Sequence, residues 1–147
     1  MMKLEGGPFL LDVNVLVALF DSRHPHHEAA QNWFAGIGPR GWRTCPITEN
    51  GLIRVLSNPV VSGYSARWIA EELENSKARA SGHGFWADSF SVSAWLRTVT
   101  LEIPSSKVTD AYLLGLAARN GGSLATFDLG ITPGLIGAAE AGIVEWI

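Results

Sequence analysis

Four acidic residues stand where a carboxylate could take part in catalysis: Asp12, Glu49, Asp110 and Asp128. Two of them directly follow short apolar runs, 9–11 and 124–127, that are typical of buried strands. The other two have apolar residues three, four and seven positions later, so each lies on the inward-facing stripe of an expected helix. Turns and helix N-termini favour single carboxylates for structural reasons alone. Four such carboxylates together indicate a site.

Converging carboxylates repel one another, and each close pair costs on the order of several kcal/mol at an effective dielectric constant of about 20. A divalent cation removes this cost. Oxygen ligands without thiolates favour Mg²⁺, with Mn²⁺ as the alternative, over zinc. Such a cluster fits hydrolysis of a phosphodiester bond, in which one or two ions activate water and stabilise the leaving oxygen. All four acids are therefore candidate catalytic residues and metal ligands.

The elements that must position these acids alternate between strand and helix patterns. Helices are expected to begin near residue 15 and to span 25–34 and 46–56. Two further helices are expected to begin after caps at Ser65 and Thr109, and the second of these ends at 120–122. Strands are expected at 9–11, 42–45, 85–86, 124–127 and 143–147. Between 89 and 106 the pattern predicts a short helix to residue 97 and an irregular or extended piece.

Strands that alternate with helices, with no hairpin signal between them, predict an α/β fold with a mostly parallel sheet. Ligands of such open sheets bind beyond the carboxyl ends of the strands, where Asp12 and Asp128 fall. The length of 147 residues fits one domain spanning 1–147.

Composition narrows the class of protein. Apolar residues make up 47% and charged residues 17% of the chain, which predicts a packed core rather than disorder. No apolar run approaches the ~20 residues that cross a bilayer, and no signal peptide is evident, so we expect a cytoplasmic protein. The single cysteine, Cys45, excludes an internal disulfide and a thiolate zinc cluster.

A formal net charge of −3 excludes a strongly basic nucleic-acid-binding tail, although not a local basic face. The candidate phosphate contacts near the acids are Arg40, Arg43, Arg54 and Lys107. Residues 67, 77 and 79 instead fit a solvated helix face. The histidines at 24, 26 and 27 have no i, i+4 pair, which argues against a transition-metal site.

Four segments that occur in family order resemble a PIN-domain ribonuclease, and more narrowly the VapC-type toxins of type II toxin–antitoxin pairs. They are LLDVNVLVALF at 10–20, CPITENGLIRVLSNP at 45–59, VTDAYLLGLAARNGG at 108–122 and LATFD at 124–128. The stretches 24–34 and 82–86 are also similar to that group. The resemblance therefore covers nearly the whole chain.

This resemblance implies a parallel, roughly five-stranded sheet flanked by helices, and a magnesium-dependent endoribonuclease that cleaves tRNA or rRNA. It implies neutralisation by a cognate VapB-type antitoxin, and it places the acidic site of the family on the same four acids. Asn14 and Thr126 match polar positions that support such sites. The chain departs from the pattern at Leu129, where many relatives carry a basic residue, and at 87–89, both in the expected RNA-contacting rim.

Two other interpretations remain open. Residues 9–14 form an expected strand followed by Asp-x-Asn, as in a HAD-like phosphatase, but that chemistry needs a second Asp in place of Asn14 and a downstream lysine. A catalytically silent PIN-like binding module is the other alternative. For partners, an expected apolar helix face of Trp68, Ile69 and Leu73, together with the resemblance, predicts a homodimer and an antitoxin complex.

Overall fold

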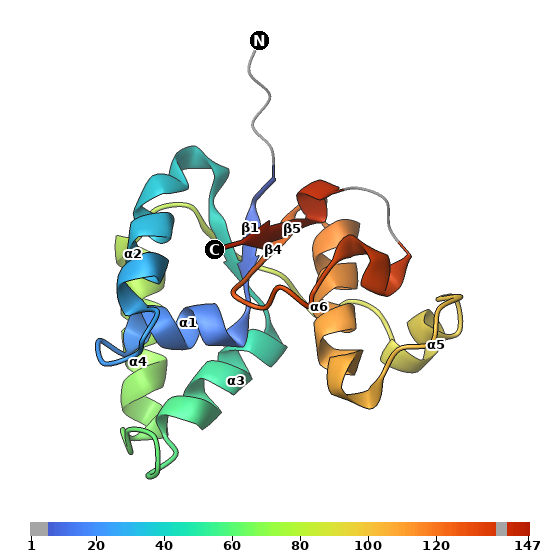
Figure 1. Ribbon diagram of the computed structural model, residues 1–147. Helices are drawn as coiled ribbons and strands as arrows, with labels where there is room; N and C mark the ends of the chain where they lie inside the picture. Colours follow the sequence, from blue (N-terminus) through green and yellow to red (C-terminus); the bar gives the residue numbers. More distant parts are fainter. Residues whose placement is uncertain (1–5, 138–140) are drawn as a thin grey trace.

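The computed structural model describes residues 6–137 and 141–147, which form a parallel sheet with helices on both faces (Figure 1). The five strands lie in the order β3-β2-β1-β4-β5, and every pair is parallel. Their bounds are β1 (Phe9–Leu11), β2 (Trp42–Thr44), β3 (His83–Phe85), β4 (Ser123–Thr126) and β5 (Val144–Trp146). The predicted α/β fold with a parallel, five-stranded sheet is confirmed.

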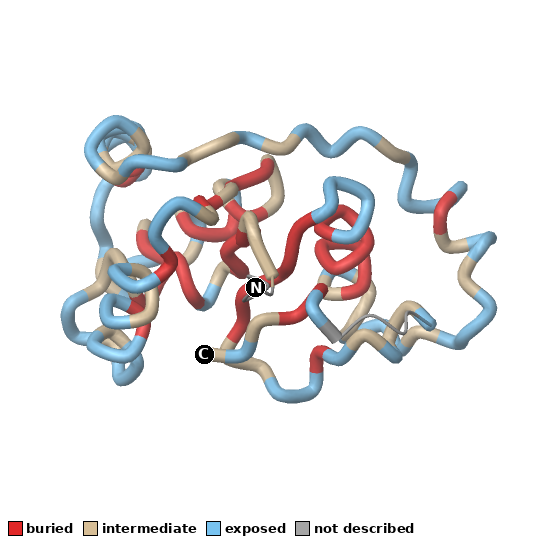
Figure 2. Tube along the Cα trace, turned by 90° about the horizontal axis from the view of Figure 1, so that it is seen from above, coloured by how far each residue is buried: buried red, intermediate tan, exposed pale blue. Residues whose placement is uncertain are grey.

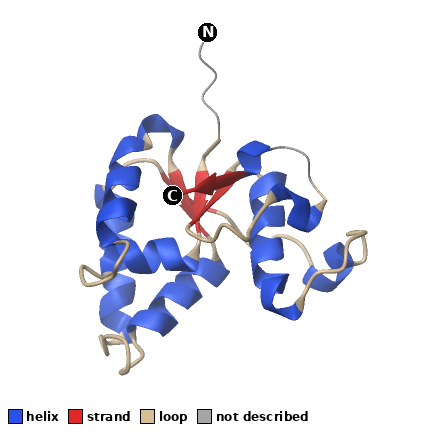
Figure 3. Ribbon diagram, viewed as in Figure 1, coloured by secondary structure: helices blue, strands red, loops and turns tan. Residues whose placement is uncertain are grey.

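Six α-helices are found in the described residues, four on one side of the sheet and two on the other (Figure 3). The first side carries α1 (Val13–Phe20), α2 (His27–Gly36), α3 (Pro46–Leu56) and α4 (Ala66–Arg79). The second side carries α5 (Val92–Leu96) and α6 (Val108–Arg119). Short 3-10 turns cover Gly38–Arg40, Ser105–Lys107, Pro133–Ile136 and Ala141–Ile143.

The central strand β1 supplies both cores because successive side chains of a strand point to opposite faces. Phe9 and Leu11 pack against α1, α3 and α4, whereas Leu10 packs against α6, and all three are fully buried. Figure 2 shows buried segments mainly in the interior of the molecule and exposed segments around its periphery. The carboxyl end of β1 therefore lies between the helices packed on the two faces of the sheet.

Local signals explain most helix boundaries. Pro46 occupies the first turn of α3, and the Ser65 hydroxyl accepts the Trp68 amide at the start of α4, as predicted. The expected Thr109 cap is wrong, because Val108 is already helical where the turn Ser105–Lys107 leads directly into α6. Gly51 lets α3 approach α1 closely, since a Cβ there would overlap the Val13 side chain.

The predicted apolar face on α4 is not a surface. Ile69 and Leu73 are fully buried in the core, and only Trp68 is exposed, stacked on Tyr64. Neighbouring residues on a helix differ by about 100° in direction, so Trp68 points away from the side that Ile69 buries. Among the described residues, no helix has the length and apolar character needed to cross a membrane.

Candidate active site

Three aspartates gather at the carboxyl ends of β1 and β4, where the rule for parallel sheets places ligands. Asp12 follows β1 and caps α1, Asp128 lies two residues beyond β4, and Asp110 is in the first turn of α6. We call Asp12, Asp110 and Asp128 the aspartate cluster. Asp12 is buried at 8% exposure, whereas the other two are partly exposed toward solvent.

The hydroxyl of Thr126 joins two members of the aspartate cluster. It donates to one carboxylate oxygen of Asp12 over 3.0 Å and accepts the backbone amide of Asp128 over 3.0 Å. The other oxygen of Asp12 accepts the Val13 amide over 2.8 Å. Asp12 is therefore fixed in one orientation by the fully buried Thr126 and by the start of α1.

Lys107 supplies the positive charge of the cluster from the turn before α6. Its ammonium donates to Asp128 over 2.9 Å and lies 3.9 Å from a carboxylate oxygen of Asp110. The amide of Gly130 donates to the second oxygen of Asp128 over 2.8 Å. Both carboxylate oxygens of Asp128 therefore already accept a hydrogen bond.

Burial and mutual repulsion act on the two less solvated acids. Burial raises the pKa of Asp12, and the carboxylates of Asp110 and Asp128 raise it further. Burial also raises the pKa of Asp110, with Asp128 acting in the same direction and Lys107 opposing it. The Lys107 ammonium lowers the pKa of Asp128. The negatively charged forms of Asp12 and Asp110 are therefore disfavoured in the folded protein. A bound cation would reduce this penalty.

Glu49 lies in the first turn of α3 as predicted, but its carboxylate does not join the other three acids. It accepts the Thr44 hydroxyl over 2.6 Å and the Lys77 ammonium over 2.9 Å, and Lys77 also pairs with Glu74. Lys77 was expected on a solvated face, yet its side chain is only 17% exposed. An opposite charge from α4 therefore draws Glu49 toward α4 and β2, and its role as a metal ligand stays a prediction.

Only one of the four predicted phosphate contacts lies in the aspartate cluster, and that residue is Lys107. Arg40 lies over the Phe9 ring, and Arg43 donates to the carbonyl of Gly82, so both reach the amino ends of the strands, opposite the cluster. Their expected position near the acids is wrong. Arg54 is exposed in the last turn of α3.

The remaining predicted support residue and the histidines lie outside these contacts. Asn14 is exposed in the first turn of α1, two residues after Asp12. His26 stacks on Phe127, with ring centroids 4.7 Å apart, and His27 contacts the Ala18 carbonyl. The ring centroids of His24 and His26 lie 5.7 Å apart.

The sequence reasoning did not identify the network of Thr44, Lys77 and His83 around Glu49. His83 Nε2 lies 2.8 Å from the Thr44 hydroxyl, and burial followed by the charge of Lys77 lowers the pKa of His83. These residues come from β2, α4 and β3, so no local spacing could have indicated them. The pairing of Lys107 with Asp110, three residues apart on adjoining helical turns, did have a local signal.

A model of the PIN domain matches residues 9–132, which include the whole aspartate cluster and Glu49. The chain belongs to the PIN domain family. Ribonuclease VapC39 of Mycobacterium tuberculosis is 43% identical to this PIN domain over 140 residues, covering 92% of this chain and 96% of the relative. Ribonuclease VapC38 of the same species is 45% identical over 124 residues, covering 83% and 86%. The resemblance to VapC-type proteins is thereby confirmed.

Two solved structures share the fold of this PIN domain. Mycobacterium tuberculosis VapC20, described as a toxin that cleaves the sarcin–ricin loop, matches with a TM-score of 0.60 at 14% identity, covering 82% of this chain and 88% of that chain. FitAB bound to an IR36 DNA fragment matches with a TM-score of 0.57 at 20% identity, covering 84% and 87%. At these identities the likeness supports the fold alone.

The donor set of this PIN domain fits a hard divalent cation. The aspartate cluster offers carboxylate oxygens and no thiolate, and burial and repulsion raise the pKa of Asp12 and Asp110. Within 6–137 and 141–147, no group of three or more His, Cys, Asp or Glu side chains is arranged to hold a metal ion. Mg²⁺ nevertheless keeps several waters and commonly takes only one or two protein carboxylates, so a closed cage is not required.

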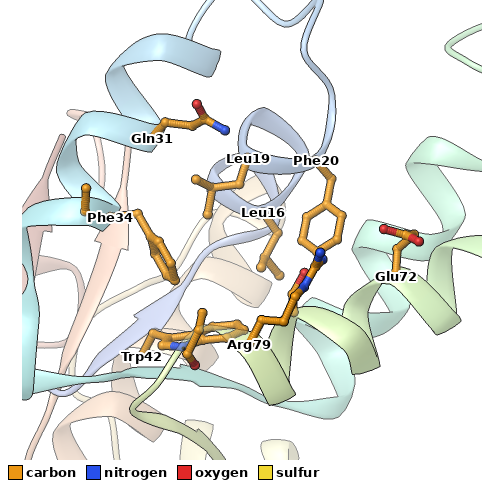
Figure 4. A pocket seen from close by; sticks show the side chains of 11 residues that line it. Leu16, Leu19, Phe20, Gln31, Phe34, Trp42, Glu72 and Arg79 are labelled. Carbon is orange, nitrogen blue, oxygen red and sulfur yellow. Dashed lines mark hydrogen bonds between the residues drawn. The ribbon is translucent and has the colours of Figure 1, made fainter.

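A separate cavity of about 550 Å³ lies between α1, α2 and α4, away from the four acids (Figure 4). Its apolar lining comes mainly from Leu16, Leu19, Phe20, Phe34 and Trp42, and Gln31, Glu72 and Arg79 add polar groups.

Proposed function

We propose that this PIN-domain protein is an endoribonuclease toxin that depends on a divalent metal ion, Mg²⁺ or Mn²⁺. The observation that carries the proposal is the aspartate cluster at the carboxyl edge of the sheet, in which Thr126 joins Asp12 to Asp128. The ribonuclease names of relatives more than 40% identical over most of the chain support RNA as the substrate, with tRNA and rRNA as the two classes to test. Cleavage of cellular RNA would take place in the cytoplasm.

Asp12 and Asp110 would hold the ion, because the Lys107 ammonium already pairs with Asp128 over 2.9 Å, whereas both donors to Asp12 are neutral. When bound, the ion supplies the positive charge that favours attack of water on the phosphodiester. The chain itself contributes orientation. Thr126 fixes the carboxylate of Asp12, and the ammonium of Lys107 holds the carboxylate of Asp128.

The HAD-like alternative is disfavoured by the PIN domain match and by Asn14, which stands where that chemistry needs an aspartate. The other alternative, a catalytically silent PIN-like binding module, would cleave no RNA. The deciding experiment incubates total RNA, purified tRNA and rRNA with the protein in EDTA, and then with Mg²⁺ or Mn²⁺ restored.

We expect discrete cleavage products with metal and none in EDTA, mapped by primer extension from the fragments. Cleavage that continues in EDTA would contradict the metal dependence. No cleavage of any RNA with either metal, by protein that melts cooperatively, would favour the silent binding module.

We further propose that the protein forms a homodimer and that a VapB-type antitoxin occupies the cavity between α1, α2 and α4. An apolar lining with Glu72 and Arg79 beside it suits an amphipathic segment of a second protein. For the homodimer, the candidate surface is the exposed apolar group of Val60, Val61, Tyr64 and Trp68, in place of the face predicted on α4.

Light scattering after size exclusion should report a dimer for the chain alone and a larger complex with the product of an adjoining small reading frame. Ala35→Glu introduces a charge at an exposed residue that lines the cavity, and should abolish the larger complex while keeping the dimer. Ala78→Glu is the matched control on an exposed position of α4 outside the cavity. A monomer alone, or an Ala35→Glu chain that retains the antitoxin, would count against the respective proposal.

A further inference from the structure

Lys107 is built into the aspartate cluster rather than placed at its rim. Its ammonium contacts Asp128 at 2.9 Å and Asp110 at 3.9 Å, and its side chain is 28% exposed. The turn after Asp128 closes around this pair at Gly130, where an added Cβ would lie 3.2 Å from the ammonium and 3.1 Å from the Asp128 carboxylate. A cation therefore already lies between two of the three acids.

The charge balance limits how many further cations the cluster can take. Three carboxylates and one ammonium leave a formal charge of −2, which one divalent ion neutralises. Glu49 is left out of this balance, because its carboxylate belongs to the separate network with Lys77 and Glu74 of α4. A second divalent ion would leave excess positive charge in a partly buried site unless Lys107 moved out.

The hydrogen-bond donors to each carboxylate indicate which two acids would hold the ion. One oxygen of Asp128 accepts the Lys107 ammonium, which is a cation, and the other accepts the Gly130 amide. Both donors to Asp12 are neutral, the Val13 amide and the Thr126 hydroxyl, so no cation hydrogen-bonded to Asp12 offsets its charge.

We infer that Lys107 is a fixed second cation of the aspartate cluster, so that the site takes one divalent ion per chain, held by Asp12 and Asp110. This inference rests on the proposed metal-dependent function. Lys107 is a positioning residue in this scheme: it keeps Asp128 away from the ion and lowers the charge that attracts a second ion.

The test is a titration of Mn²⁺ into the full-length, EDTA-treated and desalted protein, with free Mn²⁺ measured by electron paramagnetic resonance. We expect one Mn²⁺ per chain in the wild type. Lys107→Met raises the negative charge of the cluster and should tighten Mn²⁺ binding about tenfold or more, the factor that corresponds to 1.4 kcal/mol. Lys107→Arg keeps the charge and should keep the wild-type affinity.

The matched control is Arg23→Met, which removes the same charge from a surface pair with Asp21 outside the cluster, and should leave Mn²⁺ binding unchanged. Two ions per wild-type chain, or unchanged or weaker binding by Lys107→Met, would overturn the fixed-cation role while the metal site stands. No Mn²⁺ binding by the wild type would overturn both this inference and the metal dependence of the proposed function. If Lys107→Met fails to fold, the Mn²⁺ affinity of Lys107→Gln is measured in its place, and the number of ions per wild-type chain is compared with the expected one.

Discussion

Asp12→Asn should lower RNA cleavage at saturating Mg²⁺ by about a thousandfold or more while the protein remains folded. The substitution removes the charge of the most buried member of the aspartate cluster. Several kcal/mol of charge stabilisation are expected from a catalytic ion, and each 1.36 kcal/mol is about tenfold in rate. The measurement is the initial rate of cleavage of the RNA that the wild type cuts, and growth arrest on expression should disappear in parallel.

The fold should tolerate this change for two reasons. Asn is as good an N-cap as Asp, so the bond from the Val13 amide to residue 12 can persist. Burial raises the pKa of Asp12, which means that its charge is unfavourable in the folded state without metal. Asp21→Asn, at the other end of α1, is the matched control and should cleave RNA as the wild type does. Wild-type activity in Asp12→Asn would show that the site lies elsewhere.

The order of elements was predictable because the local signals are strong. Residues 46–56 carry a proline in the first helical turn and a Ser-Asn-Pro stop, and α3 has the predicted bounds. The strand at 9–11 is uniformly apolar because both of its faces are buried, as central parallel strands require. The start of α6 was misjudged by two residues, since the preceding 3-10 turn already supplies helical backbone and makes a cap unnecessary.

The positions of the four acids relative to the sheet were predictable, but the side chains that pair with them were not. Strand ends and helix first turns locate the aspartate cluster through the topology of a parallel sheet. For Glu49, the pattern indicates only that the residue faces inward, whereas its carboxylate orientation depends on Lys77, which lies on a different helix. Arg40 and Arg43 precede or lie within β2, and only the three-dimensional course of their side chains places them at the opposite edge.

Both lysines of the described residues pair with acids of the predicted site. Lys77 binds Glu49, and Lys107 binds Asp128 and approaches Asp110. An acidic site assembled without metal needs such cations, because unpaired carboxylates at close range would destabilise the fold. We expect the lysines to keep the metal-free protein stable, and under the proposed function the charge left on Asp12 and Asp110 is what a divalent ion would bind.

Asp110→Asn in metal-free buffer should raise the melting temperature, by about 2–4 °C if it relieves about 1 kcal/mol of repulsion. A residue that only complemented the N-terminus of α6 would behave in the opposite way, since loss of its charge would cost a few tenths to about 1 kcal/mol. Burial and Asp128 raise the pKa of Asp110, so its charged form is penalised in the folded state. The penalty is fully present above the raised pKa of Asp110 and is lost as the pH falls from there toward 3.8, the ordinary value, so the difference between the two proteins should shrink over that range.

Mg²⁺ should reverse the order of stability. An ion that binds only the folded wild type stabilises it by roughly 2.7 kcal/mol at a hundredfold excess over the dissociation constant, and Asp110→Asn should gain much less. The measurement is thermal melting of both proteins in EDTA and in millimolar Mg²⁺, with Glu28→Gln as a control in the first turn of α2, remote from the cluster. The control should lose a little stability in both buffers and respond to Mg²⁺ as the wild type does. If Asp110→Asn melts below the wild type in EDTA and Mg²⁺ shifts neither protein, the acids at the edge of this sheet are structural and the metal site does not exist.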